Sequence, residues 1–318
     1  MDYRPIKQLL MPCQAFLSII LLLSNFGLTQ AQVTDGASTP NVDANITDPV
    51  AIQASITPWY ILDPFQQDHI RFHCYLSMAA YGDYASSCPS TFAVQGNDFE
   101  ILETFSTDAG QAGFTARVPL MDKIVITFRG YQSTKALSWD TVPIDFGHLT
   151  PDCNETCTTG KGILDLYNSA RIATNDWAIA KAAVNRTGHK FSVTGHAIGG
   201  AVAQLAALDL GAQGLVHYAH SQAAPRCMSD TASSILARIF QGESSQHVVA
   251  NNDFFPHVFP PSPAFTRPST SVWIFGNRTQ YLQSCPYYSE NSACLGNGTS
   301  FQDHLCVSFF SFFFLAHY

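Results

Sequence analysis

Basic residues are scarce in this chain of 318 residues, which has 16 lysines and arginines against 24 aspartates and glutamates. The formal net charge is −8, and no run of basic side chains is present that would follow a phosphate backbone. We therefore expect no nucleic-acid partner. The sequence does not identify a protein partner.

The sequence also lacks internal repeats and any second composition regime. After the first 31 residues, no apolar stretch reaches the roughly 18 residues that a membrane-spanning helix needs, so we expect no transmembrane segment. Metal-ligand spacing such as H-E-x-x-H is missing among His73, His217, His220 and His257. These absences predict a single domain with no metal and no cofactor.

Residues 1–31 have the features of a secretory signal peptide. Arg4 and Lys7 precede an apolar run over 15–28, and small residues at 29–31 form a cleavage pattern. We predict a secreted, extracellular protein whose mature chain starts near Gln32. Five N-x-T sequons agree with secretion and predict glycosylation, at Asn45, Asn154, Asn185, Asn277 and Asn297.

Cysteine usage points to the same compartment. Eight cysteines remain after the signal peptide, and an even number in an oxidising compartment predicts disulfides. They are Cys74, Cys88, Cys153, Cys157, Cys227, Cys285, Cys294 and Cys306. Spacing alone does not fix their pairing.

Strand-like and helix-like patterns alternate through most of the chain. Residues 32–57 are rich in Thr, Asp, Asn and Pro and read as a loose leader, whereas 58–305 read as one α/β domain. Helices are predicted over 63–85, over 161–184 and after 197; strands are predicted over 99–105, 113–120, 123–130, 190–195, 215–220, 247–251 and 271–275. The alternation predicts a mainly parallel sheet with helices on both faces, and functional groups at the carboxyl ends of its strands.

The turn "GHAIG" at 195–199 fits the pattern G-x-S-x-G except at its centre. That pattern places a nucleophile on a sharp strand-to-helix turn, and the two glycines allow strand and helix to approach closely. Ala197 stands where the nucleophile is expected. By itself, this stretch is equally compatible with simple close packing of a strand on a helix.

Two residues further along complete the order nucleophile, acid, histidine. Asp253 lies in "NNDFFPHVFPP", 56 positions after Ala197, and His304 lies in "DHL", 51 positions after Asp253. This order is typical of α/β-hydrolases.

Over about 60–305 the chain resembles the secreted fungal class 3 lipases, including their feruloyl esterase relatives. The resemblance rests on the turn at 195–199, on Asp253 and His304, and on four further pieces: "ITFRG" at 126–130, the pair Cys153 and Cys157 ahead of a long helix, "APR" at 224–226, and "DxxPxxxPP" at 253–261. Cys285 and Cys294 also resemble a disulfide of that family. The resemblance implies an α/β-hydrolase fold and ester hydrolysis of lipids.

The resemblance also implies roles for individual residues. Asp253 would orient His304, the general base, and the backbone N–H groups of Tyr131 and Ile198 would form the oxyanion hole. The nucleophile position is Ala197, whose methyl group cannot form an acyl intermediate. We therefore predict a catalytically impaired lipase-like protein, with lipid or a small ester as any occupant of its cleft.

Other departures from the family pattern accompany the alanine. The family usually has Ser or Thr where this chain has Tyr131, a histidine-glycine segment where it has 161–164, and glycine where it has Ala224. Residues 132–145 occupy the place of the family's lid, and their mixed composition leaves lipid and soluble ester both open. The Phe-rich tail 306–318 resembles translated intron, and we interpret it as a gene-model artefact.

Two alternatives stay open. The chain is an active ester hydrolase if Ala197 is a sequence error or if another nucleophile serves. It is a secreted interaction protein if the hydrolase scaffold is kept only for its surface.

Overall fold

A nine-stranded sheet runs through the molecule, in the order β1-β11-β10-β9-β8-β7-β4-β3-β2. The computed structural model describes residues 60–62, 64–82, 100–132, 136–149, 153, 155–240, 244–259, 262–267, 270–275, 281–285 and 295–304. The strands are β1 (Tyr60–Ile61), β2 (Glu100–Ser106), β3 (Ala112–Val118), β4 (Lys123–Phe128), β7 (Phe191–His196), β8 (Val216–Gln222), β9 (Ser245–Ala250), β10 (Thr270–Phe275) and β11 (Tyr281–Ser284).

The centre of the sheet is parallel and its margins are antiparallel. Strands β4, β7, β8, β9 and β10 pair in parallel, whereas β3 pairs antiparallel with both β4 and β2, and β11 pairs antiparallel with both β10 and β1. A separate two-stranded sheet joins β5 (Thr141–Pro143) to β6 (Thr158–Gly160). The predicted α/β-hydrolase fold is confirmed. The antiparallel margins were not predicted.

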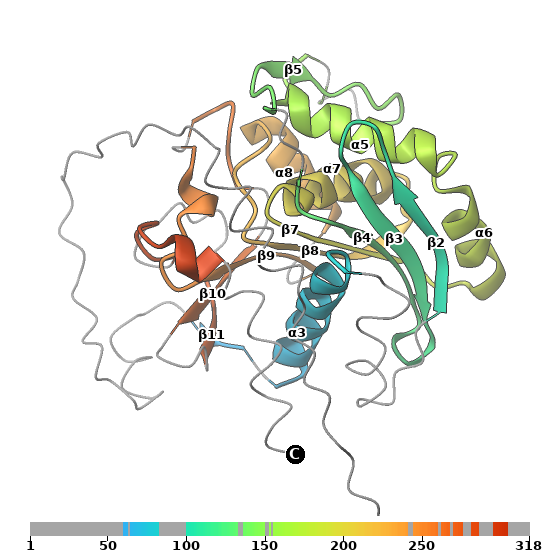
Figure 1. Cartoon of the computed structure of the whole chain (residues 1–318), viewed down its shortest axis with the longest axis horizontal. Helices are drawn as coiled ribbons and strands as arrows, with labels where there is room; N and C mark the ends of the chain where they lie inside the picture. Colours follow the sequence, from blue (N-terminus) through green and yellow to red (C-terminus); the bar gives the residue numbers. More distant parts are fainter. Residues whose placement is uncertain are drawn as a thin grey trace, which may run out of the picture.

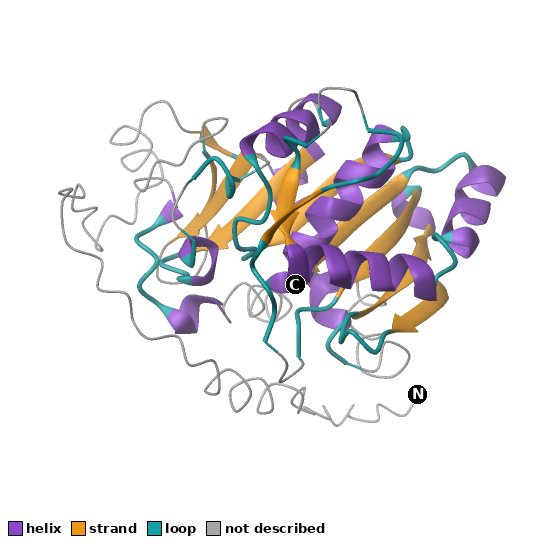
Figure 2. Ribbon diagram, turned by 90° about the horizontal axis from the view of Figure 1, so that it is seen from above, coloured by secondary structure: helices purple, strands orange, loops and turns teal. Residues whose placement is uncertain are grey.

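Helices cover both faces of the sheet (Figures 1 and 2). Helix α3 (Pro64–Ala79) lies on one face, and α7 (Ile198–Ala212) lies on the other with α5 (Lys161–Ala173) and α8 (Asp230–Ile239) beside it. Helix α7 is buried from Ile198 to Gly211, as expected for a helix that is apolar on all sides. No described helix has the length and apolar composition needed to cross a membrane.

The predicted helix over 161–184 is in fact two helices, α5 and α6 (Ala178–Thr187). Asn175, Asp176 and Trp177 all have positive φ, which ends α5. This left-handed turn places the fully buried Trp177 ring 5.7 Å from the rings of Phe105 and Phe128. Burial of a large aromatic side chain therefore outweighs continuation of the helix, and periodicity gave no sign of it.

Several other element boundaries differ from the prediction. The strand predicted over 113–120 ends at Val118, because Pro119 cannot donate to the ladder and begins a 3₁₀ turn. Helix α8 was missed, although Ser229 caps it by accepting a hydrogen bond from the Ala232 N–H. Strand β11 was also missed. The signal peptide, the leader and the tail 306–318 lie outside the described residues.

The expectation that the cysteines form disulfides is partly wrong. Cys153 and Cys157 form a disulfide with 4.9 Å between their Cα atoms, and Cys285 is also disulfide-bonded. Cys74 and Cys227, however, are free and buried. A buried thiol packs as a small apolar side chain, and the Cys227 thiol in addition lies 3.0 Å from an amide oxygen of α7. Cys88, Cys294 and Cys306 lie outside the described residues.

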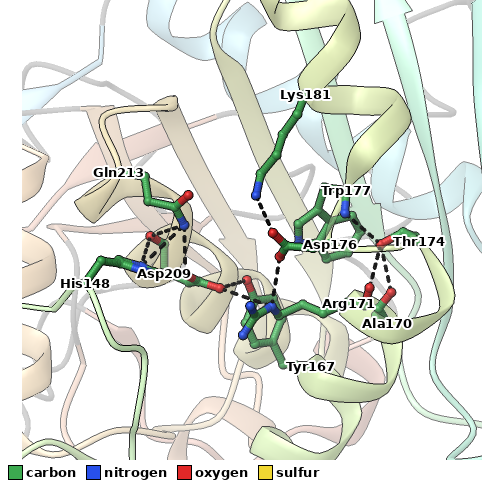
Figure 3. A network of polar contacts seen from close by, with 10 residues as sticks. All are labelled: His148, Tyr167, Ala170, Arg171, Thr174, Asp176, Trp177, Lys181, Asp209 and Gln213. Carbon is green, nitrogen blue, oxygen red and sulfur yellow. Dashed lines mark hydrogen bonds and ion pairs between the residues drawn. The ribbon is translucent and has the colours of Figure 1, made fainter.

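A buried carboxylate, Asp209, connects α7 to its surroundings on the face away from α3 (Figure 3). Its oxygens accept from the Tyr167 hydroxyl at 2.6 Å and from Gln213 Nε2 at 3.0 Å, and they lie 2.7 Å from His148 Nε2 and 3.5 Å from Arg171 Nε. Burial and the Asp209 charge raise the pKa of Tyr167 well above its usual value, so the hydroxyl keeps its proton and donates. The network holds α5 and the segment before it against α7.

Asp209→Ala should lower the free energy of unfolding by about 3 kcal/mol, because it leaves the buried Tyr167 hydroxyl without its acceptor and removes one of the two carboxylates that contact Arg171. Asp165→Ala is the matched control, since Asp165 pairs with Lys161 at the surface and its loss should change stability by less than about 1 kcal/mol. Urea denaturation of the two variants measures the difference. Equal stabilities would show that the Asp209 network contributes nothing beyond a surface ion pair.

Candidate functional site

The turn between β7 and α7 has the backbone of a nucleophile elbow. Ala197 lies at φ 55°, ψ −125°, a region that a non-glycine residue seldom occupies and that costs about 1–3 kcal/mol. Its N–H donates to the Gln222 carbonyl at 2.8 Å, and its carbonyl accepts from the Gly200 N–H at 2.9 Å. Hydrogen bonds on both sides thus hold the strained conformation although a methyl group occupies the position predicted for the nucleophile.

Both glycines of the turn are sterically required. A Cβ on Gly195 would lie 2.2 Å from the Gly199 carbonyl oxygen, and a Cβ on Gly199 would lie 2.5 Å from the carbonyl oxygens of Phe128 and Arg129. Strand β7, helix α7 and the end of β4 therefore meet at backbone contact. This is the close approach for which the G-x-S-x-G pattern selects glycine.

Asp253 and His304 meet beside this turn. Asp253 follows β9 and is fully buried, and both of its carboxylate oxygens lie 3.1 Å from His304 Nδ1. The Phe255 N–H donates to the same carboxylate at 2.9 Å and fixes its orientation. The contact favours the imidazole tautomer with its proton on Nδ1, which leaves Nε2 as an acceptor.

His196 places His304 against the elbow. Its Nε2–H donates to the His304 carbonyl at 3.2 Å, the two rings lie 4.7 Å apart, and its Nδ1 accepts from the Tyr81 hydroxyl at 2.8 Å. Burial, followed by the neighbouring His304, lowers the pKa of His196 to about 3, so it stays neutral. His196 is a positioning residue that joins α3, the elbow and the segment carrying His304.

The two predicted oxyanion donors lie on the segments that meet here. Ile198 is the first residue of α7, where a backbone N–H has no acceptor within its own helix and faces outward along the helix dipole. Tyr131 is half-buried and follows Gly130, whose Cβ would lie 3.1 Å from the His196 carbonyl oxygen. The loop carrying Tyr131 thus passes directly beside the elbow.

Phenylalanine rings enclose the Asp253–His304 pair. The rings of Phe255, Phe254 and Phe301 lie 4.6, 6.1 and 6.3 Å from the imidazole of His304. His304 is 4% exposed, whereas Phe301 is 39% exposed. The pair therefore has an apolar surround on one side and a partly exposed ring at its edge.

Arg226 is a positioning residue that the prediction of site residues did not include. Its guanidinium donates to the carbonyl of Pro256 at 3.1 Å and to the carbonyl of Phe259, both in the loop that follows Asp253. This contact explains why "APR" and "DxxPxxxPP" occur in the same chain. The motif itself, an arginine four residues after the end of β8, was the available signal.

Residues 132–145 are the segment predicted in the place of the family's lid, and the part of it that the structure describes packs against neighbouring segments. The Trp139 ring lies 4.4 Å from the Phe259 ring, and the carbonyls of Ser138 and Asp140 accept from the N–H groups of Gly162 and Lys161. These bonds satisfy the free N–H groups at the start of α5. Trp139 is half-buried and does not stand out as a lipid-facing ring.

Sequence comparison relates the chain to fungal lipases. The family described as "Lipase (class 3)" matches residues 125–262. The chain is 28% identical over 222 residues to a lipase of Rhizomucor miehei, with 65% of this chain and 58% of that one covered. It is 26% identical over 221 residues to secreted mono- and diacylglycerol lipase 1 of Fusarium solani, with 65% and 63% covered. The chain thus spans about three fifths of the length of these relatives.

Solved structures agree on the architecture. A fungal lipase–inhibitor complex superposes with a TM-score of 0.66 at 23% identity, covering 80% of this chain and 97% of the other. Lipase II from Rhizopus niveus superposes with a TM-score of 0.65 at 22% identity, covering 78% and 96%. At these identities the likeness concerns the fold.

Proposed function

Because this chain belongs to the class 3 lipase family, we propose that it is a secreted lipase-like protein whose ester-hydrolysing site has lost its nucleophile. The observation that carries the proposal is Ala197 itself, held at φ 55°, ψ −125° in the elbow beside Asp253 and His304. Acyl transfer needs an oxygen or sulfur nucleophile at that point, and a methyl group supplies none.

In this proposal the rest of the machinery keeps its family roles. His304 Nε2 is the proton acceptor, Asp253 holds the imidazole, and the N–H groups of Tyr131 and Ile198 bind the ester carbonyl oxygen. An ester or lipid that enters is therefore bound and polarised without being acylated onto the protein. Water then reacts only at the slow rate that binding and oxyanion stabilisation permit.

Secretion is part of the proposal. It is supported by the signal-like residues 1–31 and by the Fusarium solani relative, which is named as a secreted protein. Two of the predicted sequon asparagines, Asn185 and Asn297, are exposed. Asn45, Asn154 and Asn277 lie outside the described residues. Mono- and diacylglycerols, named for that relative, and feruloyl esters are the substrate classes that we propose for the ancestral site.

The wild-type protein should hydrolyse p-nitrophenyl butyrate on the order of 10⁶-fold more slowly than an active class 3 lipase assayed alongside it. A fluorophosphonate probe, which labels activated serines covalently, should leave the intact mass of the protein unchanged. Turnover at the level of the active lipase would contradict the proposal. A probe adduct mapped to any serine would identify another nucleophile and favour the alternative of an active hydrolase.

A further inference from the structure

Helix α3 lies on the face of the sheet opposite α7 (Figure 1), and a row of polar contacts fastens it there. Successive turns of α3 present His69, His73 and Ser77, and Tyr81 follows in the turn after the helix. The last three of these four residues contact Ser192, Thr194 and His196 of β7 in order. We call this row the polar ladder. Its Tyr81 end reaches the elbow, whereas its His69 end lies against β8 and holds three histidines together.

Those three histidines are His69, His73 and His220. One ring nitrogen from each lies within 4.8 Å of one from each of the others, and the ring centroids are 4.1–5.0 Å apart. His69 and His73 are four residues apart and share a face of α3, while His220 comes from β8. His73 and His220 are buried and His69 is 9% exposed, so the group sits under the helix near its edge.

Hydrogen bonds set His73 up as a ligand. Its Nδ1–H donates to the His69 backbone carbonyl at 2.7 Å, so its Nε2 carries a lone pair, which lies 2.5 Å from the Ser192 hydroxyl. An imidazole that donates one N–H to a carbonyl and directs the other nitrogen inward is the usual arrangement of a metal-binding histidine.

The other two histidines are hydrogen-bonded to each other, but one of their ring nitrogens has no partner among the described residues. His69 Nδ1 and His220 Nε2 lie 3.1 Å apart, so one donates to the other. The remaining nitrogen of His220, Nδ1, is buried and has no hydrogen-bond partner among the described residues. An unpaired buried polar atom destabilises a fold, so the described residues do not fully satisfy the polar atoms of this group.

We propose that His69, His73 and His220 form a binding site for a divalent transition metal of the zinc type. Neutral imidazoles suit zinc, copper and nickel, whereas magnesium and calcium require oxygen ligands. Zn–N bonds of about 2.0–2.1 Å place nitrogens about 3.3 Å apart, which the group reaches by small rotations of its rings. Three histidines leave a fourth position for water beside Ser192.

The electrostatic surroundings of the three histidines have two opposite effects on metal binding. Burial first, and then neighbouring positive groups, lower the pKa values of all three histidines, that of His69 to about 4. They are therefore neutral near pH 7 and do not have to lose protons to bind a metal. Lys123 opposes a cation, since its Nζ lies 5.1 Å from the ring of Tyr218, which contacts His69. Removing Lys123 should accordingly strengthen binding.

Sequence spacing did not reveal this group. The prediction of no metal site tested His73, His217, His220 and His257 for ligand spacing along the sequence and did not include His69. The three histidines of the group come from a helix and a strand about 150 residues apart. The site would fasten the far end of the polar ladder. It does not depend on whether the elbow catalyses anything.

Isothermal titration calorimetry of the full-length protein without a histidine tag tests the site, with Zn²⁺ as the titrant. One equivalent should bind, and His69→Gln and His220→Gln should each weaken binding at least tenfold. His217→Gln removes a neighbouring histidine outside the group and should bind as the wild type does. Lys123→Gln should bind several-fold more tightly.

Cobalt gives a readout that does not depend on stability. Co²⁺ added to the wild type should produce the visible absorption of tetrahedral coordination, and His69→Gln, at the least buried position of the group, should abolish it while circular dichroism stays native. Absence of stoichiometric Zn²⁺ binding to the wild type would overturn the proposal. So would Zn²⁺ affinities in His69→Gln and His220→Gln equal to that of the wild type.

Discussion

Ala197→Ser should raise the turnover of p-nitrophenyl butyrate by about 10³- to 10⁴-fold over the wild type. Losing a triad nucleophile typically lowers turnover on the order of 10⁶-fold, and the elbow geometry, Asp253 and His304 are in place to receive a serine. Full recovery is not expected, because Tyr131 replaces the usual Ser or Thr and loss of one oxyanion contact lowers turnover about 10²- to 10³-fold. Initial rates with purified variants measure the gain.

Two controls separate catalysis from contamination. Ala197→Ser combined with His304→Ala should return to the wild-type rate, because the new hydroxyl then has no base. A fluorophosphonate should add mass to the single variant at Ser in position 197 and leave the wild type unlabelled. If the folded serine variant gains nothing, the cleft no longer binds esters productively, and the interaction-protein alternative is favoured.

Acid should unfold the metal-free protein steeply below pH 6.5. Five buried histidines have pKa values that burial lowers from the ordinary 6.5, to about 4 for His69 and about 3 for His196. The five are His69, His73, His196, His220 and His247. Only the unfolded chain takes up their protons in this range, so their contribution is intact above pH 6.5 and declines as the pH falls toward 4.

The expected size of this pH effect follows from the linkage between proton uptake and unfolding. Each such histidine changes the folded-to-unfolded ratio tenfold per pH unit well below its ordinary pKa, so five change it on the order of 10⁵-fold per unit. Urea midpoints in excess EDTA between pH 7.5 and 5 measure this slope. His247→Asn should reduce the number of protons taken up on unfolding by one and lower the slope accordingly. Stability that stays constant over this range would show that the histidines are already protonated in the folded protein.

Much of the fold followed from the sequence because its signals are local. Alternating apolar runs located most strands, and the continuous apolar pattern after Gly195 located α7. Trp177 shows where periodicity ends, since it is buried in a left-handed turn at 175–177, inside a stretch whose apolar spacing predicted a single helix. The antiparallel margins come mostly from strands that are adjacent in the sequence, β2 with β3, β3 with β4 and β10 with β11, and only β1 pairs with a distant strand.

Sequence signals likewise identified part of the candidate site and missed the rest. The order of Ala197, Asp253 and His304 and the surrounding motifs indicated which residues to compare, and the structure brings Asp253 and His304 into contact. Contacts that depend on how a helix packs on the sheet have no signature in the sequence. The polar ladder is an example, including the contact of Tyr81 with His196. Whether these residues still support catalysis remains a prediction for the serine variant.

The backbone conformation at Ala197 bears on how this position can change in evolution. An unused elbow is free to accept glycine at position 197, which would relieve the positive φ, or bulkier residues that relax the turn, yet the chain has the small residue nearest in size to serine. Alanine and serine codons differ by a single base. If Ala197→Ser gains the expected turnover, the scaffold stands one nucleotide substitution from a hydrolase, and the loss of activity that we propose is reversible in evolution.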